Sequence, residues 1–196
     1  MSRILFLLFL TLPVFSDPDP LYEWKSWKSG AKNLQMQKWI GCLLQSHFDG
    51  RLCEKPENSP RFYGKLGVFI TLVKKGEIRG CFGAFHHRSD DLEKVLSDYI
   101  SGAVKEDPRY NPVRKEELEG MKIVLTVADR PIPAGNPENI DIGRYGIFLS
   151  KSGAGFVYSP GEIRTAKALK RILEQNKGSE VFYFNAVIFR TALESL

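Results

Sequence analysis

The 196-residue sequence has little of the chemistry that metal and nucleotide sites require. It contains three cysteines and three histidines, and their spacing matches no zinc site. It lacks the Gly-x-x-x-x-Gly-Lys-[Ser/Thr] segment of a phosphate-binding loop and the Gly-x-Ser-x-Gly turn of a serine hydrolase. We therefore expect neither a metal nor a cofactor.

Long apolar runs are absent beyond the N-terminus. A membrane-spanning helix needs about 20 apolar residues, and no later segment approaches that length. The N-terminus combines Arg3, the apolar residues 4–12, and small residues at Val14 and Ser16. This pattern predicts a signal peptide over residues 1–16 and a secreted or periplasmic mature protein, with an uncleaved N-terminal anchor as the alternative.

The sequence has only a small excess of positive over negative charge. The chain has 28 basic and 23 acidic residues, a net charge of +5, and cleavage would remove Arg3 and no acidic residue. The densest basic group lies on one expected helix: Arg164, Lys167, Lys170, Arg171 and Lys177. A solvated helix face accounts for this group, so nucleic-acid binding is rejected as the main function.

Three cysteines allow at most one disulfide. An oxidising compartment favours such a bond, and Cys42 and Cys53 are close in sequence with a flexible segment between them. Closing so short a loop stabilises a fold by about 2–3 kcal/mol. This pairing leaves Cys81 free, and three reduced, buried thiols are the alternative.

Helical and strand periodicities alternate along the chain after a linker over residues 17–30. Helices are expected over residues 32–48, 92–104 and 162–176, with Asp90 or Asp91 as the cap of the second. Strands are expected over residues 66–73, 78–85, 121–128, 145–150, 155–158 and 181–189. Most strands meet through short turns, which predicts one α+β domain over residues 31–196, with a mainly antiparallel sheet and packed helices.

Residues 78–83, Ile-Arg-Gly-Cys-Phe-Gly, are unusual for a strand. Each glycine costs about 0.5–1 kcal/mol relative to alanine, which a strand tolerates at a bulge or at a close approach. Alternation places Arg79 and Cys81 on one face, where a cation would lower the pKa of the thiol and make it nucleophilic. A buried structural cysteine beside a bulge is the alternative interpretation.

This segment resembles the core of the AMMECR domain family, named for the Alport-syndrome, midface-hypoplasia and elliptocytosis chromosomal region. The family core reads Leu-Arg-Gly-Cys-Ile-Gly. Residues 67–71, the Asp-Pro-Arg-Tyr segment at 107–110 and the Gly-Arg-Tyr-Gly segment at 143–146 resemble further family motifs. The resemblance covers roughly residues 30–190. A family histidine is replaced here by Tyr145, and the segment over residues 158–162 departs from the family pattern.

The resemblance implies an α+β domain with two unequal lobes and a cleft near the Arg-Gly-Cys segment. Bacterial members resemble partners of Memo-like and radical S-adenosylmethionine proteins, a grouping associated with redox or modification chemistry. It does not imply a defined reaction.

Two classes of function follow. In the first, the chain is a module that binds a protein or small molecule at a cleft. In the second, Cys81 is the nucleophile or redox thiol of an enzyme, with Arg79 as its electrostatic partner. The expected binding residues are Arg79, Gly80, Phe82, Gly83, Asp107, Arg109 and Tyr145.

Neighbouring polar residues allow two interpretations each. His86 and His87 could supply a base for Cys81 or bind a metal, or they could form an exposed loop pair. Asp107 and Arg109 could form a structural ion pair or a clamp for a substrate.

Overall fold

The computed structural model describes residues 19–62, 65–151 and 154–193. The signal peptide expected over residues 1–16 lies outside the described residues. Among those described, no helix has both the length and the apolar character needed to cross a bilayer.

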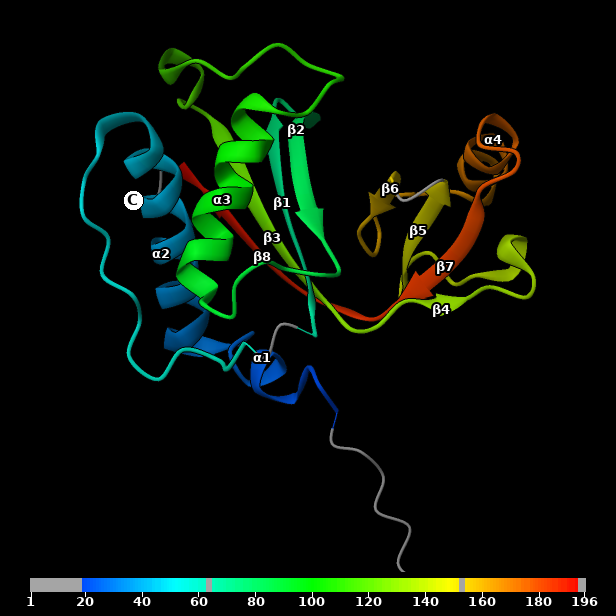
Figure 1. Cartoon of the computed structure of the whole chain (residues 1–196), viewed down its shortest axis with the longest axis horizontal. Coiled ribbons are helices and arrows are strands. Elements are labelled where there is room, and N and C mark those ends of the chain that lie inside the picture. The colour runs from blue at the N-terminus through cyan, green and yellow to red at the C-terminus, as the bar shows by residue number, and fades with distance from the viewer. Residues whose placement is uncertain (1–18, 63–64, 152–153, 194–196) are drawn as a thin grey trace, which may run out of the picture.

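The larger lobe is an antiparallel four-stranded sheet with helices on one face (Figure 1). Its strands, in spatial order, are β2 (Glu77–Ala84), β1 (Gly67–Lys74), β3 (Met121–Ala128) and β8 (Ala186–Ala192). Helices α2 (Gly30–Asp49) and α3 (Leu92–Lys105) pack against this sheet. The main core lies between the helices and the sheet, where Val68, Ile70 and Leu72 alternate toward α2 and α3.

Local signals in the sequence set the ends of both helices. The Asp91 side chain accepts a hydrogen bond from the backbone N–H of Glu93 at 3.0 Å, so it caps α3 as expected. Gly50 ends α2 in the left-handed conformation with φ of 72°. Lys75 and Gly76 also have positive φ, which forms the tight turn between β1 and β2.

The smaller lobe is a second antiparallel sheet with one helix. Its strands, in spatial order, are β4 (Ile132–Pro133), β7 (Glu180–Phe184), β5 (Gly146–Lys151) and β6 (Ala154–Tyr158). Helix α4 (Ala166–Gln175) contributes Leu169 to a core with Ile147, Leu149 and Ile163. The α+β class and the antiparallel pairing are confirmed, while the strands divide between two sheets.

Helix α1 (Tyr22–Ser26) forms within the segment expected to be a linker. Leu21, Trp24 and Trp27 are buried against the larger lobe, and the Trp24 ring meets Phe189 of β8 edge-on at 6.3 Å. Residues 21–27 belong to the domain because apolar burial, rather than any periodic pattern, orders them.

Two element boundaries differ from the prediction. The strand expected over residues 181–189 is two strands, β7 and β8, separated at Asn185. The chain passes from the smaller sheet to the larger one at Asn185, and we call this point the crossing. Asp129 fixes it, because its carboxylate accepts hydrogen bonds from the backbone N–H and the side-chain amide of Asn185 at 2.8 and 2.7 Å. Helix α4 begins at Ala166, since Thr165 caps it. Residues 130–143, between β3 and β5, contain β4 and the 3-10 helix η2 (Pro137–Asn139).

Aromatic rings join the two lobes. Phe69 of β1 and Phe184 of β7 are buried with stacked rings 6.5 Å apart, and Phe85 meets them at 5.0 and 5.5 Å. Phe148 of β5 adds a fourth ring, 5.2 Å from Phe85. This cluster of large apolar side chains fixes the lobes relative to each other.

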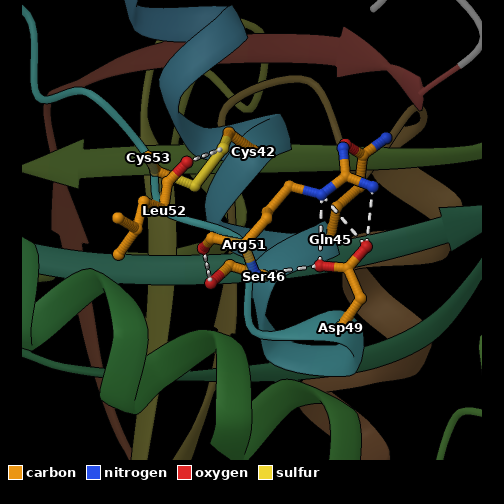
Figure 2. Close-up of a disulfide and its surroundings, with 7 residues drawn as sticks. All are labelled: Cys42, Gln45, Ser46, Asp49, Arg51, Leu52 and Cys53. Carbon is orange, nitrogen blue, oxygen red and sulfur yellow. Dashed lines mark hydrogen bonds and ion pairs between the residues drawn. A yellow bond between two sulfur atoms is a disulfide. The ribbon is translucent and has the colours of Figure 1, made fainter.

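The Cys42–Cys53 disulfide is present, with a Cα–Cα distance of 5.8 Å (Figure 2). Figure 2 shows Arg51 bent back over the end of α2, where its guanidinium binds Asp49 and Gln45. These contacts and the disulfide hold the start of the long segment between α2 and β1. Cys81 remains the free thiol, as predicted.

Candidate functional site

Cys81 lies on the face of the larger sheet that is opposite α2 and α3. It is paired in register with Thr71 of β1, which alternates with the helix-facing Ile70 and Leu72. The Cys81 Sγ and Thr71 Oγ1 atoms are 3.4 Å apart. The Cys81 backbone N–H, on the outer edge of the sheet, donates to Asp107 Oδ2 at 2.8 Å.

Asp107 and Arg109 form the structural ion pair that the sequence suggested. The Asp107 carboxylate is buried and accepts from the backbone N–H, Nε and Nη2 of Arg109 at 3.1, 2.9 and 2.7 Å. Burial acts to raise the pKa of Asp107, but the hydrogen bonds from Arg109 and Cys81 outweigh it and hold the pKa below its ordinary value. The Arg109 side chain is 41% exposed, so its guanidinium remains accessible to a partner.

Arg79 does not serve the Cys81 thiol. Leu72 pairs with Gly80 and Val73 with Ile78, so Arg79 is the extra residue of a β-bulge. Its guanidinium binds the Glu117 carboxylate at 2.8 and 3.0 Å and the backbone carbonyl of Asn111 at 2.8 Å. The expectation from simple alternation is therefore corrected, because the bulge redirects Arg79 toward the 3-10 helix η1 (Lys115–Glu117).

The glycines and Phe82 have packing roles. A Cβ atom on Gly80 would lie 2.0 Å from the backbone oxygen of Ala103 in α3, so glycine permits the close approach of that helix. A Cβ atom on Gly83 would lie 2.5 Å from the Phe69 ring. Phe82 faces α3, with its ring 5.8 Å from that of Tyr99. Gly80 and Phe82 thus face the core rather than the side of the sheet that carries Cys81.

Burial raises the pKa of the Cys81 thiol. The hydrogen bond with Thr71 and the charge of Arg109 oppose this effect, whereas the carboxyls of Glu162 and Asp107 add to it. Arg109, not Arg79, is therefore the cation that acts on the thiol. The balance keeps Cys81 protonated near neutral pH, which is the poorly nucleophilic form.

Glu162 and its neighbours bring polar groups of the smaller lobe to this face. Ser159 Oγ lies 2.9 Å from Thr126 Oγ1 of β3, and the Ser159 backbone N–H donates to Glu162 Oε2 at 2.9 Å. Burial raises the pKa of Glu162, although Ser159 and the charges of Arg109 and Arg190 act against it. The contact between Ser159 and Thr126 crosses from one lobe to the other.

We define the interlobe polar cluster as Cys81, Asp107, Arg109, Ser159 and Glu162. Sequence reasoning missed its last two members. In the sequence, residues 158–162 stand out only as a departure from the family pattern, and periodicity predicts that Glu162 begins a helix. The feature of the sequence that could have indicated them is the acidic Glu162 directly after the Ser-Pro-Gly segment at residues 159–161.

Tyr145 belongs to another surface. Its ring lies 5.2 Å from Tyr183 at 73°, and the Arg144 guanidinium carbon is 5.1 Å from the ring centroid. Tyr145 and Tyr183 line a hollow of about 280 Å³ on the smaller lobe. Cys81 lines neither this hollow nor a neighbouring one of about 300 Å³.

The histidine pair has separate environments. His86 is exposed, whereas the His87 ring contacts the Tyr99 hydroxyl at 2.7 Å and the backbone oxygen of Leu66. Burial lowers the pKa of His87. His87 therefore stabilises the larger lobe rather than acting as a base for Cys81. No group of three or more potential metal ligands occurs in the described part of the chain.

Comparisons with known proteins place these features in a family. The AMMECR1 family model matches residues 41–177, which include every member of the interlobe polar cluster. Protein Mbar_A1807 of Methanosarcina barkeri is 38% identical over 101 residues, covering 48% of this chain and 49% of that protein. A Thermotoga maritima protein is 26% identical over 160 residues, covering 75% and 92% of the two chains.

The chain spans about half the length of the Methanosarcina barkeri and Methanosarcina acetivorans relatives that it matches. The crystal structure of PH0010 from Pyrococcus horikoshii superposes with a TM-score of 0.57 at 21% identity, covering 80% of this chain and 88% of that one. At this identity the likeness concerns the fold, which the two proteins share.

Proposed function

Because this chain belongs to the AMMECR1 family, we propose that it is a binding module whose interlobe polar cluster contacts a protein or small-molecule partner. The observation that supports this proposal is the state of Cys81. Its thiol is partly buried and hydrogen-bonded to Thr71, and its raised pKa favours the protonated form. A thiol in this state contributes shape and a weak hydrogen bond rather than a nucleophile.

Arg109 is the residue of the cluster that would contact the partner. Its guanidinium is held by Asp107 on one side and is 41% exposed, so it offers preoriented donors to an acceptor group on a ligand. Glu162 supplies a partly buried carboxyl from the other lobe. A ligand that contacts both residues would bridge the two lobes.

The alkylation of Cys81 by iodoacetamide as a function of pH tests the proposal. With the Cys42–Cys53 disulfide intact, Cys81 is the single reactive thiol. We expect a midpoint above its ordinary value of about 9, with a rate at pH 8 at least tenfold below that of the urea-unfolded chain. Arg109→Gln should raise the midpoint further, whereas Arg79→Gln should leave it unchanged.

A midpoint below about 7.5 would instead indicate an activated thiolate. That result would favour the second class of function, in which Cys81 reacts covalently with a substrate. A downward shift caused by Arg109→Gln would also contradict the proposed electrostatics of the site.

We also propose that the protein is exported and loses residues 1–16. The N-terminal pattern of Arg3, an apolar segment and small residues supports this, and so does a disulfide that an oxidising compartment would maintain. N-terminal sequencing of the protein from the exported fraction should begin near Asp17. Recovery of intact Met1 from that fraction would show that cleavage does not occur.

A further inference from the structure

The hollow at Tyr145 and Tyr183 carries a second inference, which is independent of Cys81 and of the proposed function. The hollow has a volume of about 280 Å³ and lies between β7 and the segment that joins β4 to β5. Asn136, Asn139 and Asp141 line it together with the two tyrosines. We propose that this hollow binds a neutral saccharide.

The two tyrosines provide an apolar wall. Their rings are 5.2 Å apart and inclined at 73°, so one ring presents its face beside the edge of the other. A sugar ring has an apolar face made of C–H groups, which packs well against an aromatic surface. Ligand sites characteristically combine such a surface with a few polar groups that fix orientation.

The polar groups needed for orientation are unused. Among the described residues, none hydrogen-bonds to the Asn139 side-chain amide or to the hydroxyl groups of Tyr145 and Tyr183. Asn136 uses its Oδ1 atom to accept from the backbone N–H of Glu138, which leaves its amide donors available. A side-chain amide offers both donors and an acceptor, as neighbouring sugar hydroxyls require.

The surrounding backbone is held in place before any ligand arrives. Tyr183 of β7 pairs with Ile132 of β4 on one side and with Ile147 of β5 on the other. The backbone N–H of Tyr145 donates to the carbonyl of Asp141 at 2.9 Å. A site formed on paired strands loses little conformational entropy when it binds a ligand.

The charges around the hollow favour a neutral ligand. The Arg144 guanidinium lies over the Tyr145 ring, so a cationic ligand stacked there would meet a positive charge. The Asp141 carboxylate would oppose an anionic ligand in the same way. The neutral amides of Asn136 and Asn139 impose no charge on the ligand.

An adjoining hollow extends the surface. It has a volume of about 300 Å³, shares Asn136 with the first, and is lined further by Asn176, Ser179 and one charged residue of each sign, Glu138 and Lys177. Two adjoining hollows of similar size and polar lining suit a ligand with two or more linked rings. An oligosaccharide therefore fits better than a single sugar.

Titration of the folded full chain with three neutral trisaccharides, maltotriose, cellotriose and N,N′,N″-triacetylchitotriose, followed by amide resonances in NMR spectra, tests the proposal. We expect at least one of these probes to shift the resonances of residues 134–145 and 180–184. Tyr183→Ala should weaken that binding by about tenfold, and the exposed substitution Asn139→Ala by about threefold or more. Tyr22→Ala, which removes a tyrosine that is 72% exposed outside the hollow, should leave the affinity unchanged.

The proposal is wrong if none of the three probes binds with a dissociation constant of about 10 mM or lower, which is the weakest affinity that would still indicate a preformed site. It is also wrong if binding survives both Tyr183→Ala and Asn139→Ala. Choline serves as the cationic control, and shifts of the same resonances by choline alone would identify a cage for cations instead. Because Asn139 is exposed at the end of η2, the effect of Asn139→Ala can be read even if Tyr183→Ala fails to fold.

Discussion

Replacing Gly80 by alanine should lower the free energy of unfolding by about 3 kcal/mol. The new Cβ atom would lie 2.0 Å from the Ala103 carbonyl oxygen and 3.1 Å from its carbon. Both atoms belong to the backbone of α3, so the clash cannot be relieved by turning a side chain. The helix would have to move away from the sheet and disturb the main core.

Thermal and urea unfolding of Gly80→Ala measure this effect, which corresponds to a fall in midpoint of roughly 6–12 °C for a chain of this size. Gly135→Ala is the matched control, because a Cβ atom there has nothing within 4 Å and the residue does not require positive φ. It should change stability by less than about 1 kcal/mol. Equal losses in the two variants would refute the close-approach explanation.

Replacing Asp107 by alanine should be similarly destabilising, by about 3 kcal/mol. The substitution removes the acceptor of four hydrogen bonds, one from Cys81 and three from Arg109. The Cys81 backbone N–H would lose its partner on the sheet edge. Asp98→Ala is the control, because Asp98 is 57% exposed and its ion pair with Lys94 should contribute less than about 1 kcal/mol.

The effect of Asp107→Ala should depend on pH in a defined direction. The pKa of Asp107 is lower in the folded protein than its ordinary value of 3.8, so its carboxylate stabilises the fold above that pH. This contribution is lost as the pH falls through the folded-state pKa. The difference in stability between the wild type and Asp107→Ala should therefore be constant near neutral pH and shrink below about pH 3.8. A difference that grows on acidification would contradict the assignment.

The parts of the fold that depend on local chemistry could be predicted from the sequence. The cap at Asp91 and the turn at Gly76 follow from the preferences of single residues. The disulfide between Cys42 and Cys53 follows from short separation and one spare cysteine. The antiparallel pairing of β1 and β2 follows from the turn that joins them.

The parts that depend on distant contacts could not be predicted. Asn185 is the one break in the apolar run across residues 181–189, and because a single strand tolerates one polar residue, this break does not reveal that the chain passes there from one sheet to the other. Arg79 points away from Cys81 because of a bulge, which is a property of the pairing with β1 rather than of the segment itself. Ser159 meets Thr126 only because the lobes pack together, so sequence spacing gave no sign of the contact.

The crossing at Asn185 bears on how fast the protein folds. Strand β7 lies between β4 and β5, and the next strand, β8, completes the other sheet against β3. One segment, residues 180–192, therefore supplies a strand to each sheet, and each of these strands pairs with strands from much earlier in the chain (Figure 1). Pairing strands that are so far apart in the chain closes long loops, so we expect this domain to fold more slowly than one built from local hairpins.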